Sequence, residues 1–504
     1  MKNNRGKKNG SALVMTVVVM VVFMIIGSGI YTLFQANISS YEWQGELLQA
    51  RYTAEAGANL AAYMVMAGVE MPQDSFPRQL LPASGIGWYD LIGGDLGEIV
   101  VWIDPDNDND EIEAANAYGV RVLGRVGTAE NSFYYGMEVK MMPENFARFA
   151  CFQDDGFSSG YYGDGYIFSG PFFSNGPINI WSSDASTSTD PYFYSLELAT
   201  RAGGDGYYYG TSQTPGGLTV VPQRDRLQIQ PYDRMLMGPP YFDMHADQIP
   251  FNSGSVNWQR ARNKAESGGL YFDASSPHGE LPSGTRLMID NHTLHVKTGN
   301  GVPETTYDLS LLAEPVVWID NGNNDIIFIK QYPAVWPAVE RGIDMPLTIG
   351  MSGHLYVSGD HHYIDPNIMD THNDDMLGLI TVYGDVVIAE DPGDGADWGV
   401  PWRMTTDGYI YFSATFMALD GVLYAENYSQ PSGGAVDFHI VGGYLAQAEG
   451  YTSTSSSGHN IVIDYDTRLM TRHPPYFPQT GQWSIVYWEN IPDMDLQSIE
   501  WDRY

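Results

Sequence analysis

The first 70 residues contain two successive patterns of hydrophobic and polar positions. Residues 11–34 include no charged side chain, and the first charged residue after Lys8 is Glu42. A helix rises about 1.5 Å per residue, so about 20 apolar residues cross the ~30 Å hydrocarbon core of a bilayer. Apolar residues would also lie on every side of this helix, which indicates apolar surroundings on all sides. The pattern therefore predicts a transmembrane helix at residues 11–34.

A second helical pattern follows directly. Small and apolar side chains recur every three or four positions, at Leu47, Ala50, Ala54, Ala58, Ala61 and Val65. This spacing is typical of a helix with one buried face. Gly68 and Pro72 then favour the end of the helix. We expect one long helix over residues 11–70, whose first half spans a membrane and whose second half carries a folded head.

Beyond Pro72 the pattern changes to that of β-strands. Residues 98–103, 118–127 and 132–141 are continuous or alternating apolar stretches, rich in β-branched and aromatic side chains. A long helix followed by three such strands predicts an α+β arrangement with a small antiparallel sheet. We place this head at residues 71–143.

Residues 144–335 predict a β region that is rich in glycine and aromatic side chains. Within it, residues 256–267 read as one short helix that is closed by two glycines. The segment 320–325 contains Asn-Gly between two apolar runs, which favours a hairpin turn.

From about residue 336 the chain shows an irregular repeat. Short apolar stretches are broken at glycines, of which four mark the repeat: Gly359, Gly384, Gly421 and Gly443. Stacked units of this kind bury a continuous apolar strip that one unit could not bury alone. The pattern predicts a C-terminal β-solenoid at residues 336–475, with residues 459–469 as its cap and residues 476–504 as a C-terminal tail.

Basic residues precede the apolar run, at Lys2, Arg5, Lys7 and Lys8. Positive residues beside a first span stay in the cytoplasm, so everything after residue 34 is expected to lie outside. One alternative is a cleaved secretory signal, although its apolar core would be about 7–15 residues long. The other alternative is a plain single-span anchor.

The junction between this basic segment and the apolar helix is Gly10–Ser11. A short basic leader that ends in glycine before a long apolar helix resembles a class III, or prepilin, signal. Residues 10–22 (GSALVMTVVVMVV) and 47–64 (LLQARYTAEAGANLAAYM) together resemble the N-terminal region of PilX-type minor pilins. The resemblance implies that a prepilin peptidase removes residues 1–10 and leaves Ser11 as the new N-terminus.

This resemblance further implies a structural role, as a minor pilin or pseudopilin of a type IV pilus or a type II secretion-like filament. The helix would pack against other pilins, and the positions assigned to this packing are Met15, Gly27, Gly29 and Glu55. Major pilins carry a glutamate at the fifth residue of the mature chain, where this chain has Met15. Without that carboxylate, the buried amine of a neighbouring subunit has no charged partner. The resemblance therefore implies a rare subunit near the filament tip.

Localisation follows from the same resemblance. Before assembly the chain would be a single-pass inner-membrane protein with a cytoplasmic N-terminus and its bulk in the periplasm. After assembly it would lie on a pilus or the cell surface, where residues 71–143 form a pilin-like head. The large β-rich exterior would serve adhesion or the priming of assembly.

Two short motifs near the C-terminus support a second resemblance. Residues 466–469 match D-x-R-L, and residues 474–478 match P-P-x-F-P. Together with the repeat, they resemble an uncharacterised β-helical module that accompanies PilX-like N-termini. No activity is assigned to that module.

The net charge and the cysteine count exclude some classes of function and structure. The formal net charge is −36, with 61 acidic residues against 25 basic ones. Nucleic-acid binding needs a basic surface that displaces counterions, so no nucleic-acid partner is expected. Cys151 is the only cysteine, which leaves no intramolecular disulfide, and its aromatic neighbours indicate a core position.

Two acidic segments are candidates for metal binding. Alternating carboxylates at Asp104, Asp106, Asp108 and Asp110 would suit calcium, which prefers oxygen ligands. The alternative is a solvated turn, because the glycine and the twelfth-position glutamate of an EF-hand loop are both missing. No other cofactor is expected.

The second segment, residues 360–375, gathers five aspartates and three histidines in one stretch. It could bind a metal, or it could be a polar loop between solenoid units. No nucleophile, zinc or phosphate-loop motif is present, so the chain is not expected to be an enzyme and no catalytic residues are assigned. The alternative function is a membrane-anchored β-helical protein of the cell envelope that binds or cleaves carbohydrate.

Overall fold

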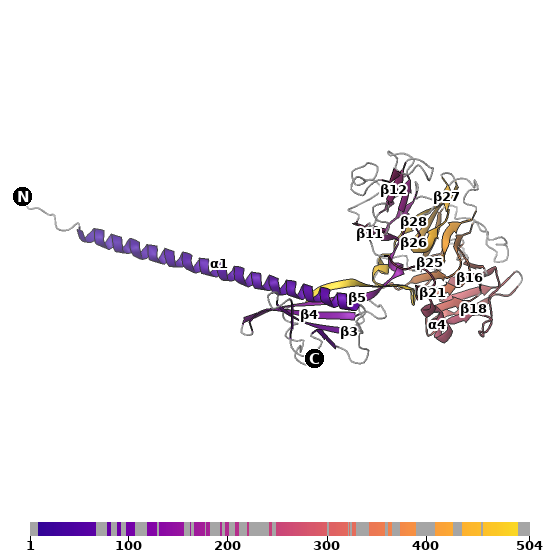
Figure 1. The fold of residues 1–504 in the computed structure, drawn as a ribbon, viewed down its shortest axis with the longest axis horizontal. Helices are drawn as coiled ribbons and strands as arrows, with labels where there is room; N and C mark the ends of the chain where they lie inside the picture. The colour runs from indigo at the N-terminus through magenta and orange to yellow at the C-terminus, as the bar shows by residue number, and fades with distance from the viewer. Residues whose placement is uncertain are drawn as a thin grey trace, which may run out of the picture. The chain divides into compact units, whose positions relative to one another are not determined.

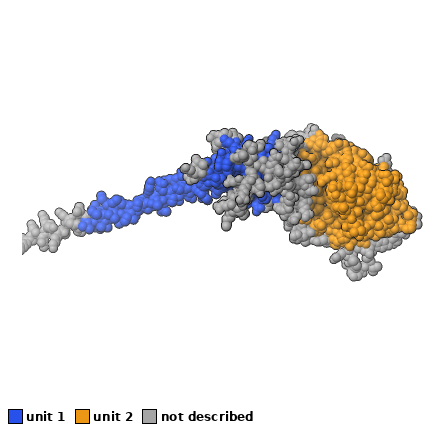
Figure 2. Space-filling view, turned by 90° about the horizontal axis from the view of Figure 1, so that it is seen from below, with its two compact units in different colours: residues 1–108, 116–142, 483–504 blue, residues 109–115, 143–482 orange. Residues whose placement is uncertain are grey.

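The protein is described by a computed structural model. It covers residues 9–66, 78–81, 88–91, 97–105, 118–128, 131–155, 162, 166–176, 178–181, 192–193, 197–200, 207–210, 219–220, 241–243, 248–299, 302–320, 322, 325–328, 342–357, 361–364, 373–389, 409–426, 436–454 and 457–491. Two compact units divide the chain (Figure 2). The first comprises residues 1–108, 116–142 and 483–504, and the second comprises residues 109–115 and 143–482.

Helix α1 (Asn9–Met66) is one uninterrupted helix of 58 residues (Figure 1). This confirms the long N-terminal helix that the sequence predicts. The described side chains from Val14 to Phe34 are exposed, whereas the small residues of the second half are buried. The two sequence patterns therefore correspond to two different surroundings on one continuous helix.

The second half of α1 packs on an antiparallel sheet of the first unit. Its strands are β1 (Arg78–Leu81), β2 (Tyr89–Asp90), β3 (Glu98–Pro105), β4 (Tyr118–Thr128), β5 (Asn131–Asn145) and β29 (Gln479–Ile491). Their order is β1-β3-β4-β5-β29, with β2 beside β3. Strands β3, β4 and β5 run antiparallel to their neighbours, as their sequence pattern predicts. Strand β29 lies within residues 476–504, which the sequence left as a tail.

Two glycines allow α1 to lie close to this sheet. A Cβ atom on Gly124 of β4 would come 2.6 Å from the Ala54 nitrogen and 2.7 Å from the Ala50 carbonyl oxygen. A Cβ atom on Gly57 of α1 would come 2.8 Å from a methyl group of Val122. Because both positions lack a side chain, the buried alanines of α1 reach the valines of the sheet.

The second unit is mostly β. Its strands are β6 (Cys151–Gln153), β7 (Ile167–Phe168), β8 (Phe172–Ser174), β9 (Ile178–Trp181), β10 (Tyr192–Phe193), β11 (Glu197–Thr200), β12 (Tyr207–Gly210), β13 (Thr219–Val220), β14 (Tyr241–Asp243), β15 (Leu270–Phe272), β16 (Thr285–Asp290), β17 (Thr293–Lys297), β18 (Thr305–Asp308), β19 (Val316–Ile319), β20 (Ile326–Phe328), β21 (Pro346–Met351), β22 (Leu355–Val357), β23 (Met376–Thr381), β24 (Val386–Ile388), β25 (Tyr409–Ala425), β26 (Val436–Glu449), β27 (Ser453–Thr454) and β28 (Ser457–Asp464). The helices are η1 (Phe146–Arg148), α4 (Gln259–Gly268), η4 (Leu309–Leu311) and η6 (Thr467–Met470). Helix α4 confirms the short helix predicted at residues 256–267 to within a few residues.

Most of these strands pair in parallel with a strand from elsewhere in the second unit, and we call the parallel-paired strands together the stack. We call the longest such series column A, which runs β15-β19-β21-β23-β25-β26-β6-β8-β11-β14. A second series, column B, runs β16-β20-β22-β24-β25. A third, column C, runs β25-β26-β28-β7-β10. Strands β19, β21 and β23 of column A are each followed along the chain by a strand of column B, whereas the long strands β25 and β26 each belong to more than one column.

The hairpin predicted at residues 320–325 is wrong. Strand β19 before this segment belongs to column A, and β20 after it belongs to column B. The two strands therefore do not pair with each other, and the segment turns the chain from one column to the next. Gly322 has a φ of 62°, which a turn of this kind requires.

Column A does not follow the order of the sequence. Strand β26, near the C-terminal end of the unit, pairs with β6, which is the first strand of the unit. Strand β28 likewise pairs with both β26 and β7. Residues 459–469 therefore do not cap the stack, because the strands from β6 onward continue it.

Apolar side chains cover one face of column A. The ring of Trp258 stacks on Trp318, with the ring centroids 5.5 Å apart. Gly350, which pairs with Trp318, leaves room for that ring, and Gly378 does the same for Phe477, because added Cβ atoms would overlap them. Trp258 and Phe477 come from outside the stack; Phe477 is buried and Trp258 is partly buried against the same core.

The close approach of α1 to β4 can be tested by adding a single methyl group. We expect Gly124→Ala to destabilise the contact by about 1–3 kcal/mol, because its Cβ meets helix backbone that cannot rotate away. Gly45→Ala is the matched control, since it meets nothing within 4 Å and should instead stabilise the helix by about 0.5–1 kcal/mol. Hydrogen exchange of the α1 and β4 amides measures both effects. Equal protection in the two variants would contradict the packing described here.

Candidate functional site

The apolar half of α1 is the largest exposed hydrophobic surface among the described residues. Residues 14–34 include sixteen large apolar side chains that are at least 45% exposed: Val14, Met15, Val17, Val18, Val19, Met20, Val21, Val22, Phe23, Met24, Ile25, Ile26, Ile30, Tyr31, Leu33 and Phe34. Within the part of the chain that the structure describes, α1 is the one helix long and apolar enough to cross a membrane. An apolar rod of this size is stable only when lipid or other apolar helices surround it.

The predicted processing and packing residues lie along this helix. Gly10 and Ser11 are in its first turn, and Met15 is exposed one turn later. Added Cβ atoms on Gly27 and Gly29 would meet nothing within 4 Å, so neither glycine is needed for packing inside this chain. Their small size remains available to a partner helix that approaches the backbone closely.

Glu55 lies in a different environment from the other packing positions. It is partly buried on the half of α1 that packs on the sheet, and its Oε1 accepts a hydrogen bond from Arg51 Nε at 2.8 Å. Forty residues separate it from Met15, which is about 60 Å along a helix. The structure therefore does not bring the four predicted packing residues together.

The predicted calcium loop lies mostly outside the described residues. Asp104 is described, and it belongs to β3, where it pairs with Gly119 of β4. Asp106, Asp108 and Asp110 fall outside the described part of the chain. Across the described residues, no three His, Cys, Asp or Glu side chains lie close enough to hold a metal ion together.

The acidic and histidine-rich segment 360–375 is not one exposed cluster where the structure describes it. His361 is fully buried against Phe412, with the ring centroids 5.0 Å apart, and burial lowers its pKa to about 3. Asp375 is also buried, whereas His362 and Asp374 are exposed. Asp360, Asp365, Asp370 and His372 lie outside the described residues. His361 is thus a neutral core side chain.

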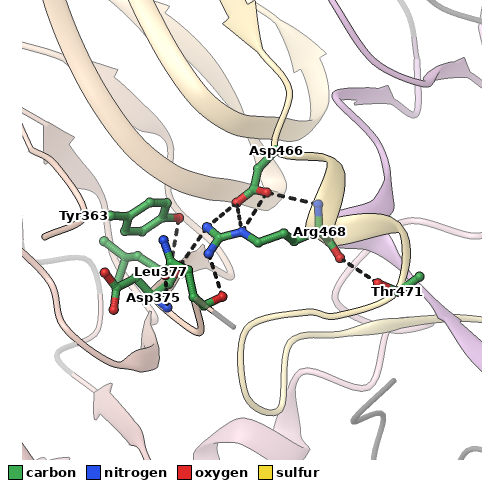
Figure 3. Close-up of polar contacts among 7 residues, drawn as sticks. Tyr363, Asp375, Leu377, Asp466, Arg468 and Thr471 are labelled. Carbon is green, nitrogen blue, oxygen red and sulfur yellow. Dashed lines mark hydrogen bonds and ion pairs between the residues drawn. The ribbon is translucent and has the colours of Figure 1, made fainter. Parts of the chain in front are cut away.

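The best-defined polar cluster lies at the D-x-R-L motif (Figure 3). Asp466 and Arg468 are buried, and Arg468 Nη2 donates to Asp466 Oδ2 at 2.7 Å. The guanidinium also donates to the carbonyl oxygens of Asn373, at 2.8 Å, and Asp375, at 3.0 Å. Its charge lies over the ring of Tyr363, 5.6 Å from the centroid. The two bonds to carbonyl oxygens therefore join the C-terminal segment to the residues just before β23.

The P-P-x-F-P motif continues the same attachment. Phe477 is buried against Gly378, and Thr348 donates to the Pro475 carbonyl oxygen at 2.5 Å. Tyr476 has a φ of 58°, a left-handed conformation, and its hydroxyl bonds to Glu314. Both motifs attach the C-terminal segment, residues 466–478, to the stack, so their role is structural.

The buried Arg468 pair can be tested by removing the charge of one partner. We expect Arg468→Met to destabilise the second unit by about 3–5 kcal/mol, because Asp466 and two carbonyl oxygens lose their partner in the core. Arg262→Met is the control, since Arg262 pairs with Asp320 at the surface and should cost about 1 kcal/mol or less. Urea denaturation followed by tryptophan fluorescence distinguishes the two. A loss for Arg468→Met no larger than the control would refute the anchoring role.

Comparisons of this chain with protein-family models, with curated proteins and with solved structures found no match. The residues and geometry of the chain itself are therefore what supports any function assigned to it.

Proposed function

We propose that this chain is a minor pilin-like structural subunit of a type IV pilus or type II secretion-like filament. The observation that carries the proposal is the division of α1 into two halves. The first half is free of charge and exposed, and the second half is continuous with it and fixed to a sheet. Such a helix joins a folded exterior to apolar surroundings without any flexible link between them.

The same apolar surface serves two successive environments in this proposal. Before assembly, residues 11–34 span the inner membrane with the basic segment in the cytoplasm. After a prepilin peptidase cuts between Gly10 and Ser11, the helix leaves the lipid and packs against the helices of other subunits. Lipid tails and apolar helices solvate these side chains equally well, so the transfer needs no change in the helix itself.

Met15 supports a minor role over a major one. The fifth residue of the proposed mature chain carries no carboxylate, so it cannot pair with the terminal amine of a neighbour in an apolar core. Repeated stacking of this chain on itself would bury one unpaired charge for each added copy. A position that is used once, at or near the tip, avoids this repeated cost.

The second unit is then the displayed exterior, and we propose that it is a β-solenoid. Its parallel columns support this architecture, since successive strands pair in register from β15 to β14. Where this unit begins and ends, the chain segments lie side by side. Phe146 N donates to the Pro478 carbonyl oxygen at 3.1 Å, and Asn145 Nδ2 donates to the Phe477 carbonyl oxygen at 2.9 Å. A body with adjacent ends can be inserted between two neighbouring strands of a sheet, which are here β5 and β29.

Processing of the N-terminus tests the proposal. When the full chain is expressed with a prepilin peptidase, we expect N-terminal sequencing to begin at Ser11. Gly10→Val is the matched control, because a branched side chain at the cleavage position should leave Met1 in place while membrane association is unchanged. An unprocessed wild-type chain would favour a plain anchor, and a mature chain that begins beyond Tyr41 and is free of membrane would exclude the filament role.

A further inference from the structure

The pairing of β26 with β6 closes the stack around the point where the chain enters the second unit. Tyr444 pairs with Cys151, and Ala446 pairs with Gln153. The backbone bond from Tyr444 N to the Ala150 carbonyl oxygen is 3.0 Å long, and Asp155 N donates to the Gln447 carbonyl oxygen at 2.8 Å. We call these paired strands the β26–β6 junction. No covalent link within the stack holds β6 here, so its position depends on these contacts.

A carboxyl group lies buried in the β26–β6 junction. Two side chains donate to Glu449 Oε2, namely Tyr444 Oη at 2.6 Å and Gln153 Nε2 at 2.7 Å. Glu449 is on β26, whereas Gln153 is on β6, so this side chain bonds across the two strands. Glu449, Tyr444 and Gln153 are all buried.

The groups that face Glu449 carry no positive charge. Cys151 and Gln153 come from β6, Tyr444 from β26 itself, and Tyr162 from the segment that follows β6. Strand β25, on the other side of β26, presents Leu423 opposite Glu449. The acidic residue that follows β6, Asp154, accepts a hydrogen bond from Asn175, and the pKa of Glu449 is attributed to burial, Tyr444, Tyr162 and Gln153. An ionised Glu449 would therefore be a buried charge that only neutral donors compensate.

The protonation of Glu449 is consequently coupled to the closure of the junction. Burial raises the pKa of this carboxyl from 4.5 to about 7, although the hydrogen bonds from Tyr444 and Gln153 oppose the change. If β6 separates from β26, water reaches the carboxyl and its pKa returns toward the ordinary value. The closed junction binds the proton more tightly than the open one, so closure is favoured below pH 4.5 and weakens as the pH rises to about 7.

We propose that Glu449 is a proton-controlled latch, which holds strand β6 tightly in the stack in its acid form and loosely once it ionises. The latch acts at the point where the chain enters the displayed unit. A more acidic medium would thus hold β6 more firmly against β26, and a neutral one would loosen this pairing.

Cys151 provides a direct measure of the latch. It is the only cysteine of the chain, it is fully buried in the junction, and a reagent reaches its thiol only when β6 opens. The full chain in detergent is labelled with 4,4′-dithiodipyridine, which reacts with thiols at acid pH. Each labelling rate is divided by the rate of the urea-unfolded chain at the same pH, which removes the pH dependence of the thiol itself. The ratio gives the fraction of molecules in which β6 has separated from β26, which we call the open fraction.

We expect the open fraction of the wild-type chain to rise about 40-fold between pH 5 and pH 7, since the pKa of Glu449 changes from about 7 when the junction is closed to 4.5 when it is open. Glu449→Gln cannot ionise and should give an open fraction that does not change with pH. Glu266→Gln, an exposed carboxylate on α4, is the matched control and should follow the wild type. A constant wild-type fraction, or the same rise in Glu449→Gln, would overturn the proposal.

A second variant keeps the test decisive if Glu449→Gln does not fold. Tyr444→Phe removes a donor that favours the ionised form, so the pKa of Glu449 in the closed state should increase further. The open fraction should then continue to rise above pH 7, where the wild type levels off. A Tyr444→Phe profile that levels off at the same pH as the wild type would count against the latch.

Discussion

The second unit depends on one interaction between distant parts of the sequence, the parallel pairing of β26 with β6. In column A, the strands up to and including β26 come from residues 270–449, and β6 and the strands beyond it come from residues 151–243. Without this pairing each group would expose an unpaired strand edge and the ends of two apolar cores. Because the pairing exists, one continuous core extends through both groups.

The chain segments around this pairing explain why particular residues occur where they do. The C-terminal segment, residues 466–478, is held by the buried Arg468 and Asp466 pair and by Phe477. Gly378 is small because the Phe477 ring lies against it, and Gly443 is small because the Phe149 carbonyl oxygen does. In the sequence, Gly443 marks a break in the repeat, and Gly378 lies inside an apolar stretch. In the structure they are sites where a covering segment approaches the stack.

In the first unit, one half of helix α1 packs on a sheet and the other half is an exposed apolar surface. An alanine face and two glycines bring α1 close to its sheet, so the helix is fixed without large side chains. The apolar half that follows toward the N-terminus needs no contact with the rest of the chain. One continuous helix therefore joins the exposed apolar residues directly to the folded sheet.

The sequence by itself determined the elements that local pattern specifies. The uncharged run and the alanine spacing fixed the extent of α1, and alternating apolar residues located β3, β4 and β5, because periodicity reports which side of an element is buried. The sequence also identified Cys151 as a core residue. Tertiary structure alone decided that β19 and β20 enter different columns, that β6 follows β26, that β29 joins the first sheet, and that Glu449 meets Gln153. Those outcomes join residues up to about 340 positions apart, and no local periodicity records which distant backbone will satisfy the edge of a strand.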